Sequence, residues 1–269
     1  MSNIEQTMLE MVNHFIQRHP QFAGQIESIC ATAQGKGFGT ASITQEVEAV
    51  FSLLQAAPRL AVDIGGNIGE YTAQLRSRQP TLEVHVFEPA LTNINALRTR
   101  FHNDAAVHLV PSAVARESGA STLFADAAGS GMASLSKRKL DHFGIHFTHS
   151  ETISTIRFED YWTDVLKCRP IDIVKLDIEG HEMAALESFG AAIDSTKIIQ
   201  FEFGGANIDT RTFFQDFWYF FKTHQFAMYR VTPFGHSPIA DYRETDEYFS
   251  TTNYLAVRLP PATTASQNL

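Results

Sequence analysis

The chain has 269 residues, 44% of them hydrophobic and 19% charged, a composition that suits a globular protein with one large core. Thirty acidic residues against 21 lysines and arginines leave a formal charge of -9, which argues against nucleic acid as a partner. With two cysteines and no apolar run near the roughly 20 residues that cross a bilayer, the sequence favours a cytoplasmic protein over a disulfide-rich or membrane-inserted one.

The first 57 residues are predicted to form a helical extension that acts as a cap or a dimerisation element. Apolar residues between positions 4 and 19 recur at spacings of three and four, which predicts an amphipathic helix. A second helix is predicted over residues 22–33. A third, with Thr40 or Ser42 as its N-cap, precedes the first strand.

From residue 60 onward, short apolar runs alternate with helical stretches, which is typical of a parallel sheet covered on both faces. We therefore expect a doubly wound α/β domain over residues 58–259, followed by a disordered tail over 260–269. The last two runs are joined by a turn-rich segment and are predicted to pair antiparallel. The irregular stretch after the third run contains a predicted flexible lid at 127–131. The seven predicted strands are 60–64, 84–87, 107–110, 171–176, 198–203, 226–231 and 254–257.

A glycine-rich turn follows the first predicted strand. Gly65 and Gly69 permit a tight turn, and the helix that follows offers free N–H groups to a carboxylate. This arrangement suits the amino-acid end of S-adenosylmethionine (SAM). An NAD-binding turn would need glycine where Asn67 and Glu70 stand, so a nucleotide-binding oxidoreductase is the weaker alternative. Glu88 ends the second strand, where its carboxylate can accept hydrogen bonds from ribose hydroxyls.

Three segments resemble the FkbM family of methyltransferases: 62–69, 87–89 and 174–182, the last with the pattern Asp-x-Glu-Gly-x-Glu. The resemblance extends over about residues 40–258. It implies a class I methyltransferase (Rossmann-like) fold, SAM as methyl donor, and a hydroxyl acceptor on a sugar, a saccharide-containing molecule or a polyketide-like metabolite. The cofactor-binding residues that it implies are Asp63, Gly65, Gly66, Asn67, Gly69 and Glu88, with Ser112 and Ala113 beside the adenine.

Methyl transfer to a hydroxyl requires alignment of the acceptor oxygen, exclusion of water and a group that accepts the hydroxyl proton. Ligands of a doubly wound sheet lie beyond the carboxyl ends of its strands, where Asp177 and Glu202 are expected. Asp177, His181 and Glu202 are the candidate bases, with Asp177 first. Asp177 and Glu202 are also the expected ligands of a divalent metal, which we do not favour because the sequence identifies no third ligand.

A non-catalytic SAM-binding module is the remaining alternative function. The presence of Asp63, Glu88 and Asp177 argues against it, because a decayed site should have lost some of these acids. The aromatic-rich stretch 213–221 predicts a helix packed on the sheet, and an alternative interpretation gives Phe214 and Trp218 to a homodimer contact.

Overall fold

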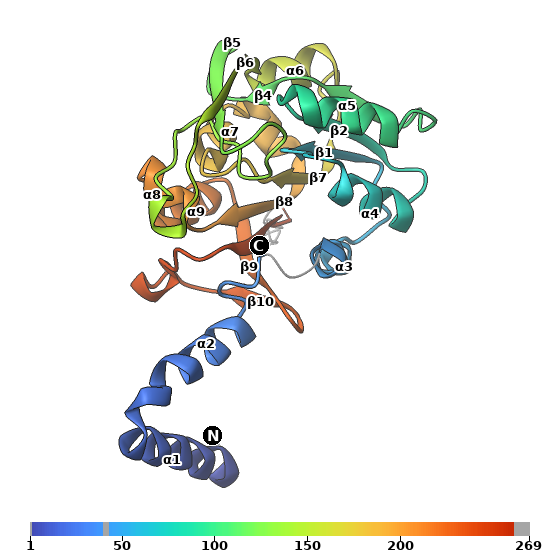
Figure 1. Ribbon diagram of the computed structural model, residues 1–269. Coiled ribbons are helices and arrows are strands. Elements are labelled where there is room, and N and C mark those ends of the chain that lie inside the picture. Colours follow the sequence, from blue (N-terminus) through green and yellow to red (C-terminus); the bar gives the residue numbers. More distant parts are fainter. Residues whose placement is uncertain (1, 40–42, 261–269) are drawn as a thin grey trace, which may run out of the picture.

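The computed structural model describes residues 2–39 and 43–260, and its centre is one large sheet (Figure 1). The strands of this sheet are β1 (Leu60–Ile64), β2 (Glu83–Phe87), β3 (Val107–Val110), β7 (Ile171–Leu176), β8 (Thr196–Phe203), β9 (Phe226–Thr232), β10 (Gly235–Ile239) and β11 (Thr252–Arg258). Their order across the sheet is β10-β9-β11-β8-β7-β1-β2-β3. Neighbouring strands from β3 to β8 are parallel, whereas β11 runs antiparallel to both β8 and β9.

All seven predicted strands are present, and the antiparallel pairing of the last two is confirmed. The predicted number of strands is wrong by one, because β10 adds an eighth strand in a hairpin with β9. This strand lies at the edge of the sheet, is largely exposed and contains Pro238. An edge strand needs no buried apolar face and tolerates proline, so it lacks the apolar run that identified the others.

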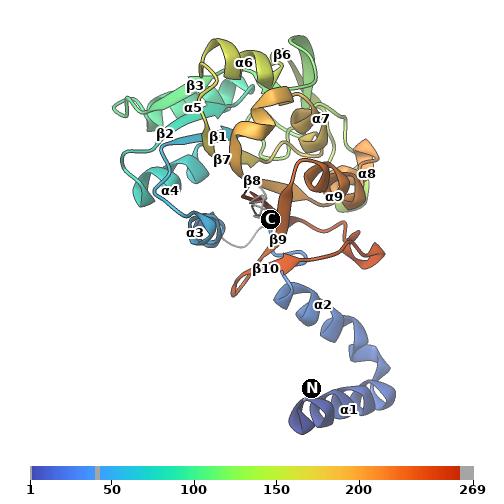
Figure 2. The ribbon, with the colours of Figure 1, turned by 180° about the vertical axis from the view of Figure 1, so that it is seen from behind.

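Helices cover both faces of the sheet, which confirms the doubly wound α/β fold (Figures 1 and 2). Successive residues of β1 point to opposite faces, with Ala61 in one apolar core and Val62 in the other. The first core is completed by α3 (Ile43–Leu53), α4 (Glu70–Arg78) and α5 (Leu91–Arg100). The second is completed by α6 (Phe158–Asp164), α7 (Glu182–Glu187) and α9 (Phe214–Thr223). The short helices α8 (Ala206–Thr210), η3 (Gly190–Ser195) and η4 (Glu244–Asp246) lie in connections.

The aromatic-rich helix α9 packs on the sheet, as predicted. Its Phe217 ring stacks on Phe201 of β8 with centroids 4.7 Å apart, and Phe214 lies 4.5 Å from the Tyr254 ring of β11. Phe214 and Trp218 are both buried within the chain. The alternative prediction of a homodimer contact through these two residues is therefore wrong, because both side chains are already buried within the same chain.

A second, three-stranded sheet occupies the long irregular stretch of the sequence. It consists of β4 (Ala113–Val114), β5 (Gly119–Ala125) and β6 (His149–Ile156) in the order β4-β6-β5, with η2 (Asp141–Phe143) between the last two strands. Residues 126–140 leave β5 and run back over the carboxyl ends of the central strands. We call these residues the covering segment.

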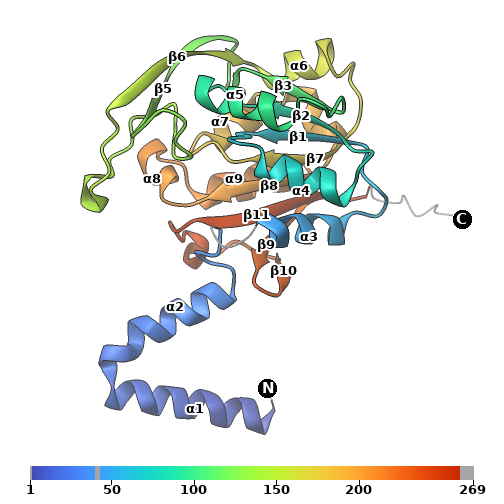
Figure 3. The same ribbon diagram turned by 45° about the vertical axis from the view of Figure 1, so that its right-hand side comes forward.

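The N-terminal helices lie apart from the sheet. Figure 3 shows α1 (Asn3–Arg18), η1 (Pro20–Phe22) and α2 (Ala23–Ala33) as an arm that extends away from it. By contrast, α3 contributes Val47 and Val50 to the first core. The boundary at residue 57 stays a prediction, as does the disordered tail. The proposed caps Thr40 and Ser42, and residues 261–269, lie outside the described residues. No helix in the described part of the chain has the length and apolarity to cross a bilayer.

Candidate active site

The carboxyl ends of the parallel strands border two adjoining openings. The first is lined by Glu88 after β2, Ala113 of β4, His181 and part of the covering segment. The second is lined by residues of α3 and α4 together with Lys175 of β7. Gly65, Asn67 and Asp177 line both openings. A ligand held at this shared wall can therefore extend into each opening.

The turn after β1 passes so close to β7 that only glycine fits at its first position. Gly65 has a φ of +87°, and a Cβ there would lie 1.9 Å from the carbonyl oxygen of Asp177. The N–H groups of Gly65 and Gly66 both donate to the Phe87 carbonyl oxygen at 3.0 Å. The turn is thus fixed between two neighbouring strands before any ligand binds.

Glu88 fastens the same turn from the side of β2. Its Oε2 accepts the N–H of Asn67 at 2.8 Å, and its Oε1 accepts the N–H of Ala90 at 2.8 Å. Burial raises the pKa of Glu88 to about 7, although both backbone donors act in the opposite direction. Each carboxylate oxygen can accept a second hydrogen bond, so Glu88 can still receive the hydroxyls of a ribose in the first opening.

The other residues of the predicted cofactor set fall into two groups. Gly66 and Ala113 line the openings, whereas Asp63, Gly69 and Ser112 do not. Asp63 is completely buried beneath the turn, where its Oδ2 accepts a hydrogen bond from the Thr72 hydroxyl at 2.6 Å. Burial raises the pKa of Asp63. Asp63 thus links the end of β1 to Thr72 of α4. Its contact with a cofactor stays a prediction.

Three carboxylates gather at the ends of β7 and β8. One oxygen from each of Asp177, Glu179 and Glu202 lies within 4.8 Å of the others. Burial and the neighbouring Asp177 raise the pKa of Glu179 to about 8, and they raise that of Glu202 well above its ordinary value. Two cations balance the cluster: Lys175 donates to Asp177 Oδ2 at 2.9 Å, and Arg138 forms an ion pair with Glu179.

His181 lies on the wall of the first opening, which Asp177 and Glu179 also line. Its Nε2 is 3.0 Å from the Ser136 hydroxyl, and burial, followed by the charge of Arg116, lowers the pKa of its imidazole. The three candidate bases therefore occupy different surroundings, since Asp177 lines both openings, His181 lines the first, and Glu202 adjoins Asp177 without lining either.

The covering segment closes one side of the first opening. The Ser134 hydroxyl donates to the Glu179 carbonyl oxygen at 2.8 Å, and Arg138 reaches Asp209 as well as Glu179. Ser130 and Gly131, from the predicted lid, are among the residues that line the opening. The predicted lid therefore lies at the site, and its flexibility stays a prediction.

A buried polar network that no sequence motif predicted borders the second opening. Gln200 Nε2 donates to Glu46 Oε2 at 2.6 Å, and the Tyr71 hydroxyl donates to Gln200 Oε1 at 2.8 Å. Lys175 lies 5.1 Å from the centroid of the Tyr71 ring. Burial raises the pKa of Glu46 to about 7. One signal was available, because Glu46 interrupts the apolar face that Val50 and its neighbours form on the third predicted helix.

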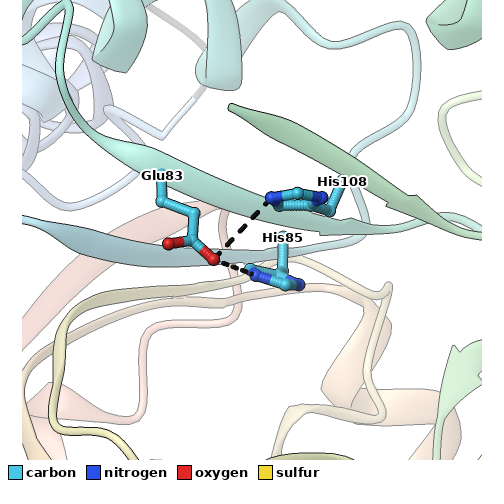
Figure 4. A group of neighbouring side chains, drawn as sticks. All are labelled: Glu83, His85 and His108. Atoms are coloured by element: carbon cyan, nitrogen blue, oxygen red, sulfur yellow. Dashed lines mark hydrogen bonds and ion pairs between the residues drawn. The ribbon is translucent and has the colours of Figure 1, made fainter. Parts of the chain in front are cut away.

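A second cluster with metal-ligand chemistry lies at the amino-terminal ends of β2 and β3. Glu83 Oε1 lies 2.9 Å from His85 Nε2 and 3.7 Å from His108 Nε2, and Figure 4 shows these side chains facing one another. Arg169 already donates to both oxygens of Glu83 and, as the principal cause, lowers the pKa of Glu83 to about 2. Tyr161 binds the other ring nitrogen of His85 at 2.7 Å. This cluster is an ion-pair network that joins the strands to the loop carrying Arg169.

Comparison with known proteins gives one family. The model of the methyltransferase FkbM domain matches residues 63–230. Methyltransferase 1 of Beauveria bassiana (strain ARSEF 2860) is 27% identical over 139 residues, a match that covers 46% of the chain and 56% of that relative. The chain thus spans little more than half the length of this relative.

Solved structures with a similar arrangement are distant in sequence. The plantazolicin methyltransferase BpumL in complex with SAH has a TM-score of 0.46 and 7% identity over 87% of the chain and 90% of that structure. A putative rRNA-methylase from Clostridium thermocellum has a TM-score of 0.46 and 12% identity over 81% of the chain and 96% of that structure.

Proposed function

Because the chain belongs to the FkbM methyltransferase family, we propose that it is a SAM-dependent O-methyltransferase. Its acceptor is a hydroxyl on a sugar, a saccharide-containing molecule or a polyketide-like small molecule. One observation carries the proposal: the turn at Gly65 and Asn67, together with Asp177, lines both openings at the carboxyl ends of the strands. One ligand seated at this turn has a nucleoside end in the first opening and an amino-acid end in the second.

The chemistry of each opening fits the corresponding part of SAM. Glu88 offers acceptors to ribose hydroxyls, and the neighbouring Ala113 and Leu123 offer apolar surface to an adenine. In the second opening, Glu46 carries a carboxylate for the ammonium group, while Lys175 and the N–H groups at the start of α4 face a carboxylate. Asn67 Oδ1, buried and without a hydrogen bond from the described residues, is a free acceptor at the shared wall.

SAM supplies an electrophilic methyl group on a sulfonium centre, and the residues of the chain position the acceptor and receive its proton. Asp177 is the proposed base because it alone of the three candidates lines both openings. Its Oδ2 is held by Lys175 at 2.9 Å, which leaves Oδ1 for the acceptor hydroxyl. Burial and the neighbouring Asp177 raise the pKa of Glu202, which adjoins Asp177 without lining either opening, so Glu202 acts on the proposed base and does not touch the acceptor.

A divalent metal has a third candidate ligand in Glu179, which the sequence did not identify. Oxygen ligands from Asp177, Glu179 and Glu202 suit a hard cation such as Mg²⁺. However, Lys175 and Arg138 already pair with two of these carboxylates. We therefore propose a reaction without a metal, in which Lys175 balances the charge of Asp177.

Calorimetric titration of the purified protein with SAM, S-adenosylhomocysteine and NAD tests the cofactor assignment. We expect binding of the first two and none of NAD. Glu88→Gln should weaken SAM binding, whereas Glu117→Gln, at an exposed position outside both openings, should leave it unchanged. NAD binding in place of SAM would favour an oxidoreductase instead.

Catalysis is tested separately, with isotopically labelled SAM and a panel of saccharide and polyketide-like acceptors. Labelled methyl on an acceptor oxygen, located by nuclear magnetic resonance, would support O-methylation. SAM binding with no transfer to any acceptor class would favour the non-catalytic module, and a label on nitrogen or carbon would contradict the proposed reaction.

A further inference from the structure

The helix α1 is well formed, yet its apolar side lies in solvent. Ser2 and Glu5 form a capping box at its start, in which each side chain accepts the backbone N–H of the other residue. None of its 16 residues is buried, although Ile4, Met8 and Met11 are large apolar residues with exposed fractions between 62% and 73%. Soluble monomers seldom leave such a contiguous apolar surface uncovered.

These apolar residues form one continuous stripe. Ile4, Met8, Met11 and Phe15 are separated by four, three and four positions, which places them on one side of a helix with Val12 beside them. We call Ile4, Met8, Met11, Val12 and Phe15 the α1 stripe. Its spacing is that of the a and d positions of a coiled-coil seam, a pattern that packs against another helix.

The α1 stripe lies in solvent on an arm that extends away from the central sheet. Phe15 packs against His19 and Phe22, with ring centroids 5.0 Å and 5.8 Å away, and this contact fixes the bend between α1 and α2. The arm extends from the sheet in both Figure 1 and Figure 3, with α1 at its far end. A second helix can therefore reach α1 without meeting the central sheet.

We propose that the α1 stripe binds the α1 helix of a second copy of this chain, with the two helices antiparallel about a two-fold axis. The stripe is self-complementary in this arrangement. When Ile4 lies opposite Phe15 of the second copy, Met8 lies opposite Met11, and the symmetry repeats both contacts. Every residue in the a/d seam of α1 up to Phe15 then has an apolar partner.

The charges of α1 favour the antiparallel direction. Glu5 and Glu10 lie in its first half, and His14 and Arg18 lie in its second half. Antiparallel helices place each acidic half beside a basic half and oppose the two helix dipoles, whereas parallel helices place like charges together.

A second copy also fits α1 better than an anionic membrane surface does. Helices that lie on such membranes carry several lysines or arginines on their polar face. Over its length, α1 has two glutamates, one arginine and no lysine, and the whole chain has a formal charge of -9. These charges repel anionic lipids.

The mass of the full chain in solution tests the proposal. By light scattering after size exclusion, we expect twice the chain mass of 30.0 kDa. Met8→Glu/Met11→Glu places four carboxylates in the seam and should give the single-chain mass. The control, Gln6→Glu/Asn13→Glu, adds the same charge to the opposite side of α1 and should stay dimeric. Both variants should keep the melting temperature of the domain, since α1 buries no residue against it.

Cross-linking tests the direction of the helices. In a chain whose exposed Cys30 and Cys168 are replaced by serine, Ile4→Cys alone should form no disulfide, because antiparallel packing separates the two positions by about 16 Å along the axis. A mixture of the Ile4→Cys and Phe15→Cys proteins should form a disulfide-linked dimer upon oxidation.

Three results would overturn the proposal. The first is a single-chain mass for the unaltered protein at tens of micromolar concentration. The second is a dimer that survives Met8→Glu/Met11→Glu, because the contact would then lie elsewhere. The third is an unaltered protein that is monomeric and sediments with phosphatidylserine vesicles, which would assign α1 to a membrane.

Discussion

Replacing Gly65 with alanine tests whether the turn between β1 and α4 positions the shared wall of the two openings. The φ of +87° costs a residue with a Cβ about 1–2 kcal/mol. In addition, the new Cβ would lie 1.9 Å from the Asp177 carbonyl oxygen, so the backbone must move by about 1.5 Å to restore van der Waals contact. Overpacking of this kind costs about 1–3 kcal/mol. We therefore expect the free energy of unfolding of Gly65→Ala to be about 3 kcal/mol lower than that of the unaltered protein.

The matched control is Gly144→Ala. Gly144 also has a positive φ, of +70°, but nothing lies within 4 Å of its added Cβ. The free energy of unfolding of this variant should fall only by the cost of the positive φ, about 1–2 kcal/mol. The variant should bind SAM with unchanged affinity. Urea unfolding and calorimetry measure both effects. Gly65→Ala should also reduce SAM affinity about 10- to 100-fold, equivalent to one charged hydrogen bond. Equal losses of stability in the two variants, with unchanged SAM affinity, would refute the role given to the turn.

Three further predictions concern the acids of the site. SAM affinity should fall as the pH is lowered through about 7, where Glu88 becomes protonated, and calorimetry of Glu88→Gln should find weaker binding with a smaller pH dependence, because Glu46 still titrates in the same range. Burial raises the pKa of Glu46 in the folded protein to about 7, from an ordinary value of 4.5, so the native state holds the proton of Glu46 more tightly than the unfolded chain does. Its stabilising contribution is full below pH 4.5 and is lost, by about 3 kcal/mol, as the pH rises through 7. Urea unfolding should therefore show that the free energy of unfolding falls less between pH 5 and pH 8 for Glu46→Gln than for the unaltered protein. An equal fall in both proteins would contradict a raised pKa at Glu46. Exhaustive chelation should leave methyl transfer unchanged, whereas a loss that Mg²⁺ restores would assign a metal to Asp177, Glu179 and Glu202.

Local sequence patterns were sufficient for the central strands and for the turn. Strands buried on both faces appear as continuous apolar runs, so all seven predictions were confirmed, while the exposed edge strand β10 gave no such signal. Gly65 and Glu88 stood out because each follows such a run directly. The edge at which strand-end residues meet was predictable because parallel strands all finish at one edge.

The sequence by itself determined the doubly wound sheet, the glycine turn, the positions of Glu88 and Asp177, and the amphipathic nature of α1. Each of these depends on residues that are close in the chain. Only the tertiary structure decided which distant side chains share a cavity: Glu46 meets Gln200 across 154 positions, and Arg138 meets Glu179 across 41. It also excluded the alternative of a homodimer contact for α9, and it showed that the apolar side of α1 stays exposed. Apolar periodicity gives a helix an apolar face, but the surface that covers this face depends on the path of the whole chain.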